Sequence, residues 1–110
     1  MFVRYDECKE KALRLREGFL DHNRRLIDLR DRFEGNDLNY DSQRVLINSM
    51  VDEWNDMMEV LSQIQVIPGY QRQCCLSAEH CRSLRDDTYP GLCRLAGEYG
   101  LSRTVKRPPV

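Results

Sequence analysis

Residues 71–81, QRQCCLSAEHC, hold most of the side chains in this chain that could do chemistry. With one later cysteine, they place five thiol or imidazole groups within 20 residues: Cys74, Cys75, His80, Cys81 and Cys93. Zinc is held by four such ligands in a tetrahedron, and paired ligands usually stand two to four residues apart around a tight turn. Here the pairs are adjacent and their side chains diverge. We therefore expect cysteines that pack as small hydrophobes, with zinc binding as the alternative.

Catalysis would require a nucleophile with a base beside it and a site that stabilises an oxyanion. On a helix His80 diverges from the neighbouring Cys81, and the other histidine, His22, lies in a separate helical segment. The sequence contains neither a glycine-rich phosphate loop nor a G-x-S-x-G motif. We therefore predict a protein that is not an enzyme and that uses no cofactor.

The overall composition narrows the class of protein further. The 110 residues carry a formal net charge of −1, so no global attraction to nucleic acid or to an anionic membrane is expected. Charged residues run through the N-terminus and no window of 18 apolar residues occurs, which indicates neither a signal peptide nor a membrane span. We expect a cytoplasmic or nuclear protein whose five cysteines are reduced thiols.

The first part of the chain predicts one long helix over residues 4–34. Its apolar seam alternates steps of three and four residues, as in a heptad repeat, through Tyr5, Cys8, Ala12, Leu15, Phe19, His22, Leu26, Leu29 and Phe33. Gly35 follows at the place of a C-cap. Because His22 is the polar member of the seam, we expect it to set the packing register, with a pH-sensitive switch as the alternative.

A second helix is predicted over residues 41–67. Asn39, Asp41 or Ser42 is placed to cap its start, and Pro68-Gly69 ends it. Its seam repeats the same spacing through Ile47, Met50, Trp54, Met57, Leu61 and Ile64. Further apolar residues flank this seam, so the helix should lie at the centre of a bundle, and the short linker predicts an antiparallel hairpin. We interpret the tryptophan and methionines as core, with an adaptable peptide-binding groove as the alternative.

The C-terminal third predicts two short helices followed by a tail. Ser77 is a suitable N-cap for a helix over residues 77–86, and Pro90 suits the first turn of another over residues 90–99. Residues 1–100 would then form a single helical domain. Residues 101–110 are basic and contain two prolines, which predicts a flexible tail.

Residues 92–107, LCRLAGEYGLSRTVKR, resemble the helix-turn-helix pattern of bacterial regulators, with Ala96, Gly100, Ser102 and Val105 near the characteristic positions. The resemblance implies that a second helix enters the major groove of DNA and reads base edges. It covers 16 residues, and the slightly acidic chain does not carry the usual basic footprint. A small nucleic-acid- or zinc-binding module is therefore the alternative function.

The two long helices carry more apolar surface than two short helices can cover. Long exposed apolar rows are rare on soluble monomers, so we expect the uncovered face to bind another helical surface. The candidate residues for partner binding are Leu13, Leu20, Ile27, Val51 and Met58. We predict an all-α fold, a long antiparallel helical hairpin with one or two short C-terminal helices, that serves as a protein–protein interaction and assembly module. Homodimerisation is the leading mode, and docking to a different helical protein is the second.

Overall fold

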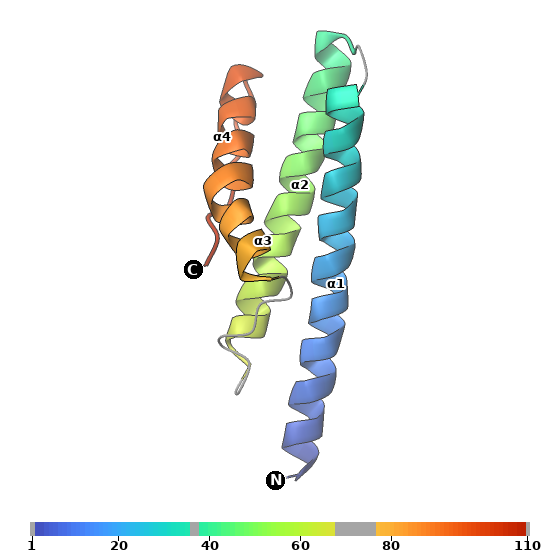
Figure 1. The fold of residues 1–110 in the computed structure, drawn as a ribbon, viewed down its shortest axis with the longest axis vertical. Helices are drawn as coiled ribbons and strands as arrows, with labels where there is room; N and C mark the ends of the chain where they lie inside the picture. Colours follow the sequence, from blue (N-terminus) through green and yellow to red (C-terminus); the bar gives the residue numbers. More distant parts are fainter. Residues whose placement is uncertain (1, 36–37, 68–76, 110) are drawn as a thin grey trace.

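A computed structural model describes residues 2–35, 38–67 and 77–109, with side chains described from residue 7 onward. The elements in chain order are α1 (Phe2–Gly35), α2 (Tyr40–Gln65), α3 (Ala78–Ser83), η1 (Leu84–Thr88) and α4 (Tyr89–Glu98). No strand occurs in these ranges, so the predicted all-α fold is confirmed. The long helices α1 and α2 lie side by side and antiparallel, and the C-terminal helices pack beside one half of that pair (Figure 1).

The helix α2 is the central element of the fold. All six members of its predicted seam are buried, and two flanking residues are buried with them, giving the set Ile47, Met50, Val51, Trp54, Met57, Met58, Leu61 and Ile64. On α1 only three described members of the predicted seam are buried, namely Ala12, Phe19 and Leu26. This difference arises because α1 contacts one long neighbour, whereas α2 is covered by α1 on one side and by α4 on another.

Capping side chains fix where α2 and α3 begin. Asn39 Oδ1 accepts a hydrogen bond from the backbone N–H of Ser42 at 2.8 Å, and Ser77 Oγ accepts one from the backbone N–H of His80 at 3.2 Å. Each bond satisfies a donor in the first turn that has no partner within the helix. Both caps are among those predicted from the sequence.

The C-terminal helices differ from the two separate short helices that the sequence predicts. Helical structure is continuous from α3 through η1 into α4, and η1 is a wide π turn in which the backbone N–H of Tyr89 donates to the carbonyl of Leu84. The cause is Pro90, which has no N–H to donate and whose ring crowds the carbonyl four residues before it. The wider π turn just before Pro90 accommodates the proline ring, so the helical structure continues into α4.

The helix α4 ends in a Schellman motif. The backbone N–H of Leu101 donates to the carbonyl of Ala96 at 2.8 Å, and that of Gly100 donates to the carbonyl of Gly97 at 3.2 Å. Gly100 adopts a φ of 66°, a left-handed conformation that side chains with a Cβ rarely adopt. The chain therefore reverses direction here.

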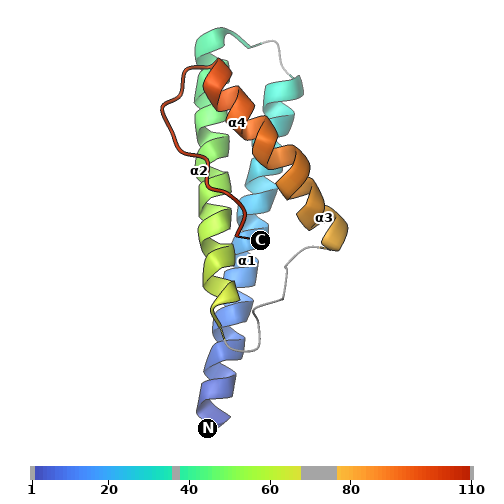
Figure 2. The ribbon, with the colours of Figure 1, turned by 90° about the vertical axis from the view of Figure 1, so that its left-hand side faces the viewer.

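Residues 101–109, called the strap below, run back along α2 without regular secondary structure (Figure 2). Val105, in the middle of the strap, is 8% exposed and belongs to the same core cluster as Trp54 and Leu92. The strap is therefore packed, in contrast to the flexible tail expected from its composition. The second helix implied by the helix-turn-helix resemblance is not formed, because these residues are extended.

Candidate interaction surfaces

Two of the five residues predicted to bind a partner lie in the interior of the chain. Val51 is fully buried and Met58 is 2% exposed, and both belong to the core cluster that contains Leu92, Ala96 and Val105. This corrects the predicted face, because α4 and the strap together occupy the side of α2 that the sequence left without a neighbour. Sequence reasoning missed this cover because an extended segment carries no periodic signal.

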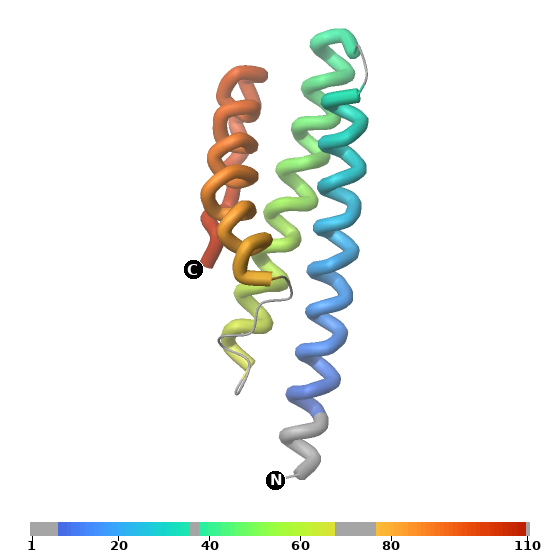
Figure 3. The backbone as a smooth tube through the Cα atoms, in the orientation of Figure 1, coloured from blue at the N-terminus to red at the C-terminus, as the bar shows by residue number. Residues whose placement is uncertain are grey.

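The other three predicted residues form a row along α1 at seven-residue spacing. Leu13 is 49% exposed, Ile27 is 39% exposed, and Leu20 between them is partly buried against the core. The row, called the α1 row below, extends over about 21 Å at 1.5 Å per residue. Figure 3 shows that the N-terminal part of α1 projects beyond the C-terminal helices, which accounts for the exposure at that end.

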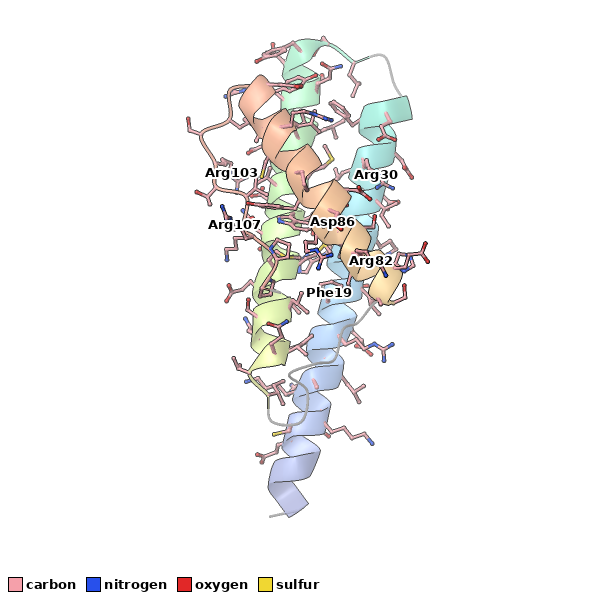
Figure 4. All side chains as sticks on the ribbon, turned by 60° about the vertical axis from the view of Figure 1, so that its left-hand side comes forward. Phe19, Arg30, Arg82, Asp86, Arg103 and Arg107 are labelled. Atoms are coloured by element: carbon pink, nitrogen blue, oxygen red, sulfur yellow. The ribbon has the colours of Figure 1, made fainter. Side chains whose placement is uncertain are left out.

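A groove of about 700 Å³ lies next to one end of the α1 row, between α1 and the segment from α3 to α4. Its apolar lining comes from α1, α2, η1 and α4 and includes Leu26, Ile27, Phe33, Met50, Leu84, Leu92 and Leu95. Charged side chains of both signs stand among the lining residues, namely Arg30, Glu34, Asp87 and Arg94. Figure 4 shows Arg30 on the α1 side, facing the helical segment that carries Arg82 and Asp86. Ile27 joins the groove to the α1 row.

A polar cluster joins the middle of α1 to the middle of α2. His22 Nδ1 lies 2.6 Å from Glu53 Oε2, and Arg25 Nε donates to Glu53 Oε1 at 2.9 Å. The side chains of His22 and Glu53 are each about one-fifth exposed, so the pair is partly shielded from water. A polar contact at one fixed position of an apolar seam favours a single register, as expected for His22 from the sequence.

The same cluster is the one group in the described part of the chain whose ligand atoms are close enough to hold a metal ion: His22, Glu53 and Asp56. These residue types suit zinc or another divalent cation. However, both carboxylate oxygens of Glu53 already face a partner on α1, and the Arg25 guanidinium supplies the positive charge that a metal would bring. The geometry therefore favours an ion-paired contact between helices over a metal centre.

The zinc candidates named from the sequence are not assembled among the residues described. His80 is exposed and its Nδ1 lies 2.7 Å from Ser77 Oγ, and Cys93 is an exposed free thiol on α4. Cys81 is disulfide-bonded, so the expectation of five reduced thiols is wrong for this residue. Cys74 and Cys75 lie outside the described ranges.

The strap is held on α2 by side chains that bond its backbone. Asn55 Nδ2 donates to the carbonyl of Thr104 at 3.0 Å, while Asn55 Oδ1 accepts from the N–H of Lys106 at 2.8 Å. The indole N–H of Trp54 donates to the carbonyl of Lys106 at 2.7 Å. Charge is the one feature of the sequence that favours this contact, because the second helix carries five acids against one base and the strap is basic.

Ion pairs between side chains flank these backbone bonds. Arg103 pairs with Asp52 and its Nη1 also donates to Asn48 Oδ1 at 2.9 Å, while Lys106 Nζ lies 3.1 Å from Glu59 Oε2. The hydrogen bond from Lys106 is the main cause that lowers the pKa of Glu59 below its ordinary value. Figure 4 shows Arg103 and Arg107 on the strap beside α2.

The fold and these surfaces define an all-α protein with a helical hairpin, an open apolar groove and a strap held in place by side chains. Comparisons with known proteins found no family model, no curated protein and no solved structure that matches the chain. No helix in the described ranges is both long and apolar enough to cross a bilayer. The function must therefore be argued from the surfaces themselves.

Proposed function

We propose that this protein is a non-enzymatic protein–protein association module that binds a helical surface along the α1 row and the adjoining groove. The single observation that carries the proposal is the exposure of Leu13 and Ile27 on a helix whose other apolar residues from Phe19 to Phe33 belong to the core or pack against it. Burying such side chains against an apolar partner stabilises a complex by about 25 cal/mol for each Å² of apolar area removed from water.

A second copy of the chain is the occupant that we propose. It carries the same row, so two copies can pair through identical surfaces and close a symmetric dimer without leaving an open end. The groove beside Ile27 adds apolar surface from Leu84, Leu92 and Leu95 to the contact. Packing a helix against this region would complete the kind of four-helix arrangement that helical hairpins commonly form.

The experiment is a measurement of oligomeric state by native mass spectrometry and sedimentation at several protein concentrations. Wild-type protein is expected to show a concentration-dependent dimer. A Leu13→Asp/Ile27→Asp double variant is expected to be monomeric with unchanged helicity, because both side chains are exposed and their replacement leaves the core intact. Leu20 is less suitable for the test, since it also packs against the core.

Val45→Asp provides the matched control. Val45 is an apolar residue on α2 that is 66% exposed and lies outside the α1 row and the groove, so this variant is expected to behave like the wild type. A wild-type chain that remains monomeric at every concentration would contradict the homodimer. A double variant that dimerises as well as the wild type would show that the α1 row is not the contact.

A further inference from the structure

We propose that the face of α2 formed by Asp52, Trp54, Asn55 and Glu59 is a recognition site for an extended basic peptide segment of the form Arg-x-Val-Lys. In this structure residues 103–106 of the strap occupy the site in cis. This surface lies on a different helix from the α1 row. The inference therefore goes beyond the proposed association through α1.

The backbone bonds select an extended conformation. The two bonds of Asn55 fall on either side of Val105, one to the carbonyl before it and one to the N–H after it. A neighbouring β-strand would bond an extended residue in the same way, and one carboxamide can do so because it offers both a donor and an acceptor. Trp54 adds a third bond, to the carbonyl of Lys106. None of these three bonds depends on the side chains of the segment that is bound.

Side-chain contacts supply the sequence preference. Val105 inserts between the two backbone bonds of Asn55 and is 8% exposed, so a polar residue at this position would lose its hydration. Arg103 and Lys106 stand on either side of it and pair with Asp52 and Glu59 respectively. Along α2, Asp52, Asn55 and Glu59 thus lie opposite Arg103, Val105 and Lys106 in turn. The bound segment is therefore a cation, a β-branched residue and a second cation.

The arrangement differs from ordinary packing between helices because side chains of a preformed helix bond the backbone of a segment that has no regular secondary structure. The strap is joined to α4 by the turn at Gly100 and by the bond from the Leu101 N–H to the Ala96 carbonyl, and residues 102–109 form no helix. A chemically identical segment from another molecule would make the same contacts. The tethered strap has an effective concentration on the order of millimolar, so it masks the site from weaker competitors.

The test uses the 110-residue chain with the strap released by Val105→Asp/Lys106→Glu, which removes the buried apolar contact and reverses one charge. A fluorescently labelled peptide of residues 101–110, LSRTVKRPPV, is the probe, and its binding is followed by anisotropy. The released variant is expected to bind the peptide about tenfold or more tightly than the wild-type chain, whose site is occupied. Adding Asn55→Ala to the released variant is expected to weaken binding by about tenfold again, since two hydrogen bonds are lost.

Matched controls separate recognition of the segment from attraction of charge. Asp56→Ala in the released variant removes an acid from the residue next to Asn55, but Asp56 lies beside His22 on the α1 side of α2, so binding should be unchanged. A peptide of the same composition in scrambled order should bind at least about tenfold more weakly than LSRTVKRPPV. Equal binding of the two peptides would overturn the proposal, because it would reduce the site to an acidic surface.

A released variant that keeps its helicity and binds no peptide would also overturn the proposal, because the strap would then be only a structural contact.

If the released variant fails to fold, the proposal can still be tested on the wild-type chain by NMR. With ¹⁵N-labelled protein and unlabelled peptide in the millimolar range, the backbone amide resonance of Lys106 should move toward its free-chain position as the strap is displaced. An unchanged resonance at saturating peptide would contradict the inference. Binding should persist in the Leu13→Asp/Ile27→Asp variant, so failure of the proposed dimer is distinguishable from failure of this site.

Discussion

The imidazole of His22 lies 2.6 Å from the carboxylate of Glu53, so the middle of α1 is joined to the middle of α2 by one polar contact in an otherwise apolar seam. Arg25 donates to the other oxygen of the same carboxylate. Glu53→Gln keeps the shape of the side chain but removes its charge. We expect this change to lower the free energy of unfolding by about 1 kcal/mol, because the pair is partly shielded.

Urea denaturation followed by circular dichroism measures this effect. Glu17→Gln is the control, since it makes the same chemical change at an exposed glutamate on α1, outside the cluster of His22 and Glu53. The control should change the free energy of unfolding by less than about 0.5 kcal/mol. Equal effects of the two substitutions would show that general charge, rather than the contact with His22, determines the result.

Phe19 is fully buried at the centre of the α1–α2 interface, and its replacement should be among the most damaging in the chain. Phe19→Ala is expected to reduce the free energy of unfolding by about 3–5 kcal/mol, from lost apolar burial and from the cavity left behind. Chemical denaturation is the measurement, and Val45→Ala at an exposed position should have almost no effect. A loss below about 1 kcal/mol for Phe19→Ala would contradict the packing described for this interface.

Two glycines at the end of α4 should respond to alanine with opposite signs. Gly97 lies within the helix with open space where a Cβ would stand, so Gly97→Ala should stabilise the protein by about 0.5–1 kcal/mol. Gly100 has a φ of 66°, so Gly100→Ala should destabilise it by about 1 kcal/mol. Thermal unfolding of the two variants side by side provides the comparison. A shift of both melting temperatures in the same direction would contradict the Schellman motif.

The ion pair between Lys106 and Glu59 makes attachment of the strap dependent on pH. The hydrogen bond from Lys106 lowers the pKa of Glu59 below 4.5 in the folded chain. The contribution of this pair to the stability of the folded chain is therefore fully present above pH 4.5. The contribution is lost as the pH falls through the lowered pKa. In Lys106→Met the pKa of Glu59 should rise toward 4.5, as measured by carboxyl ¹³C titration. An identical titration in both proteins would show that the pair does not form in solution.

The helical hairpin could be predicted from the sequence because its signal is local and repeated. Steps of three and four residues identified all six seam residues of α2, and Asn39 and Ser77 marked helix starts through their own side chains. The burial of the five candidate interface residues could be predicted only in part. Leu13 and Ile27 are exposed as expected, whereas the burial of Val51 depends on contacts with chain segments distant in sequence.

The remaining differences have the same physical origin. Nothing in the spacing of residues 101–109 indicates that Val105 inserts into the core, because one apolar residue in a basic, proline-containing segment has no period. The expected break between two C-terminal helices is absent, although Pro90 lies in the first turn of α4 as expected. The structure passes through it by widening one turn, which depends on the backbone of the preceding residues rather than on a recognisable motif.

Trp54 is the sole tryptophan of the chain and is fully buried. Its ring stacks on Tyr89 at a centroid distance of 6.2 Å, and its indole N–H donates to the carbonyl of Lys106 in the strap. The fluorescence of this one side chain therefore reports whether the strap is bound to α2. Displacement of the strap would bring water to the indole and shift its emission to longer wavelength, whereas changes confined to the exposed α1 row would leave the spectrum unaltered. Intrinsic fluorescence can thus follow the strap independently of the α1 row in unlabelled protein.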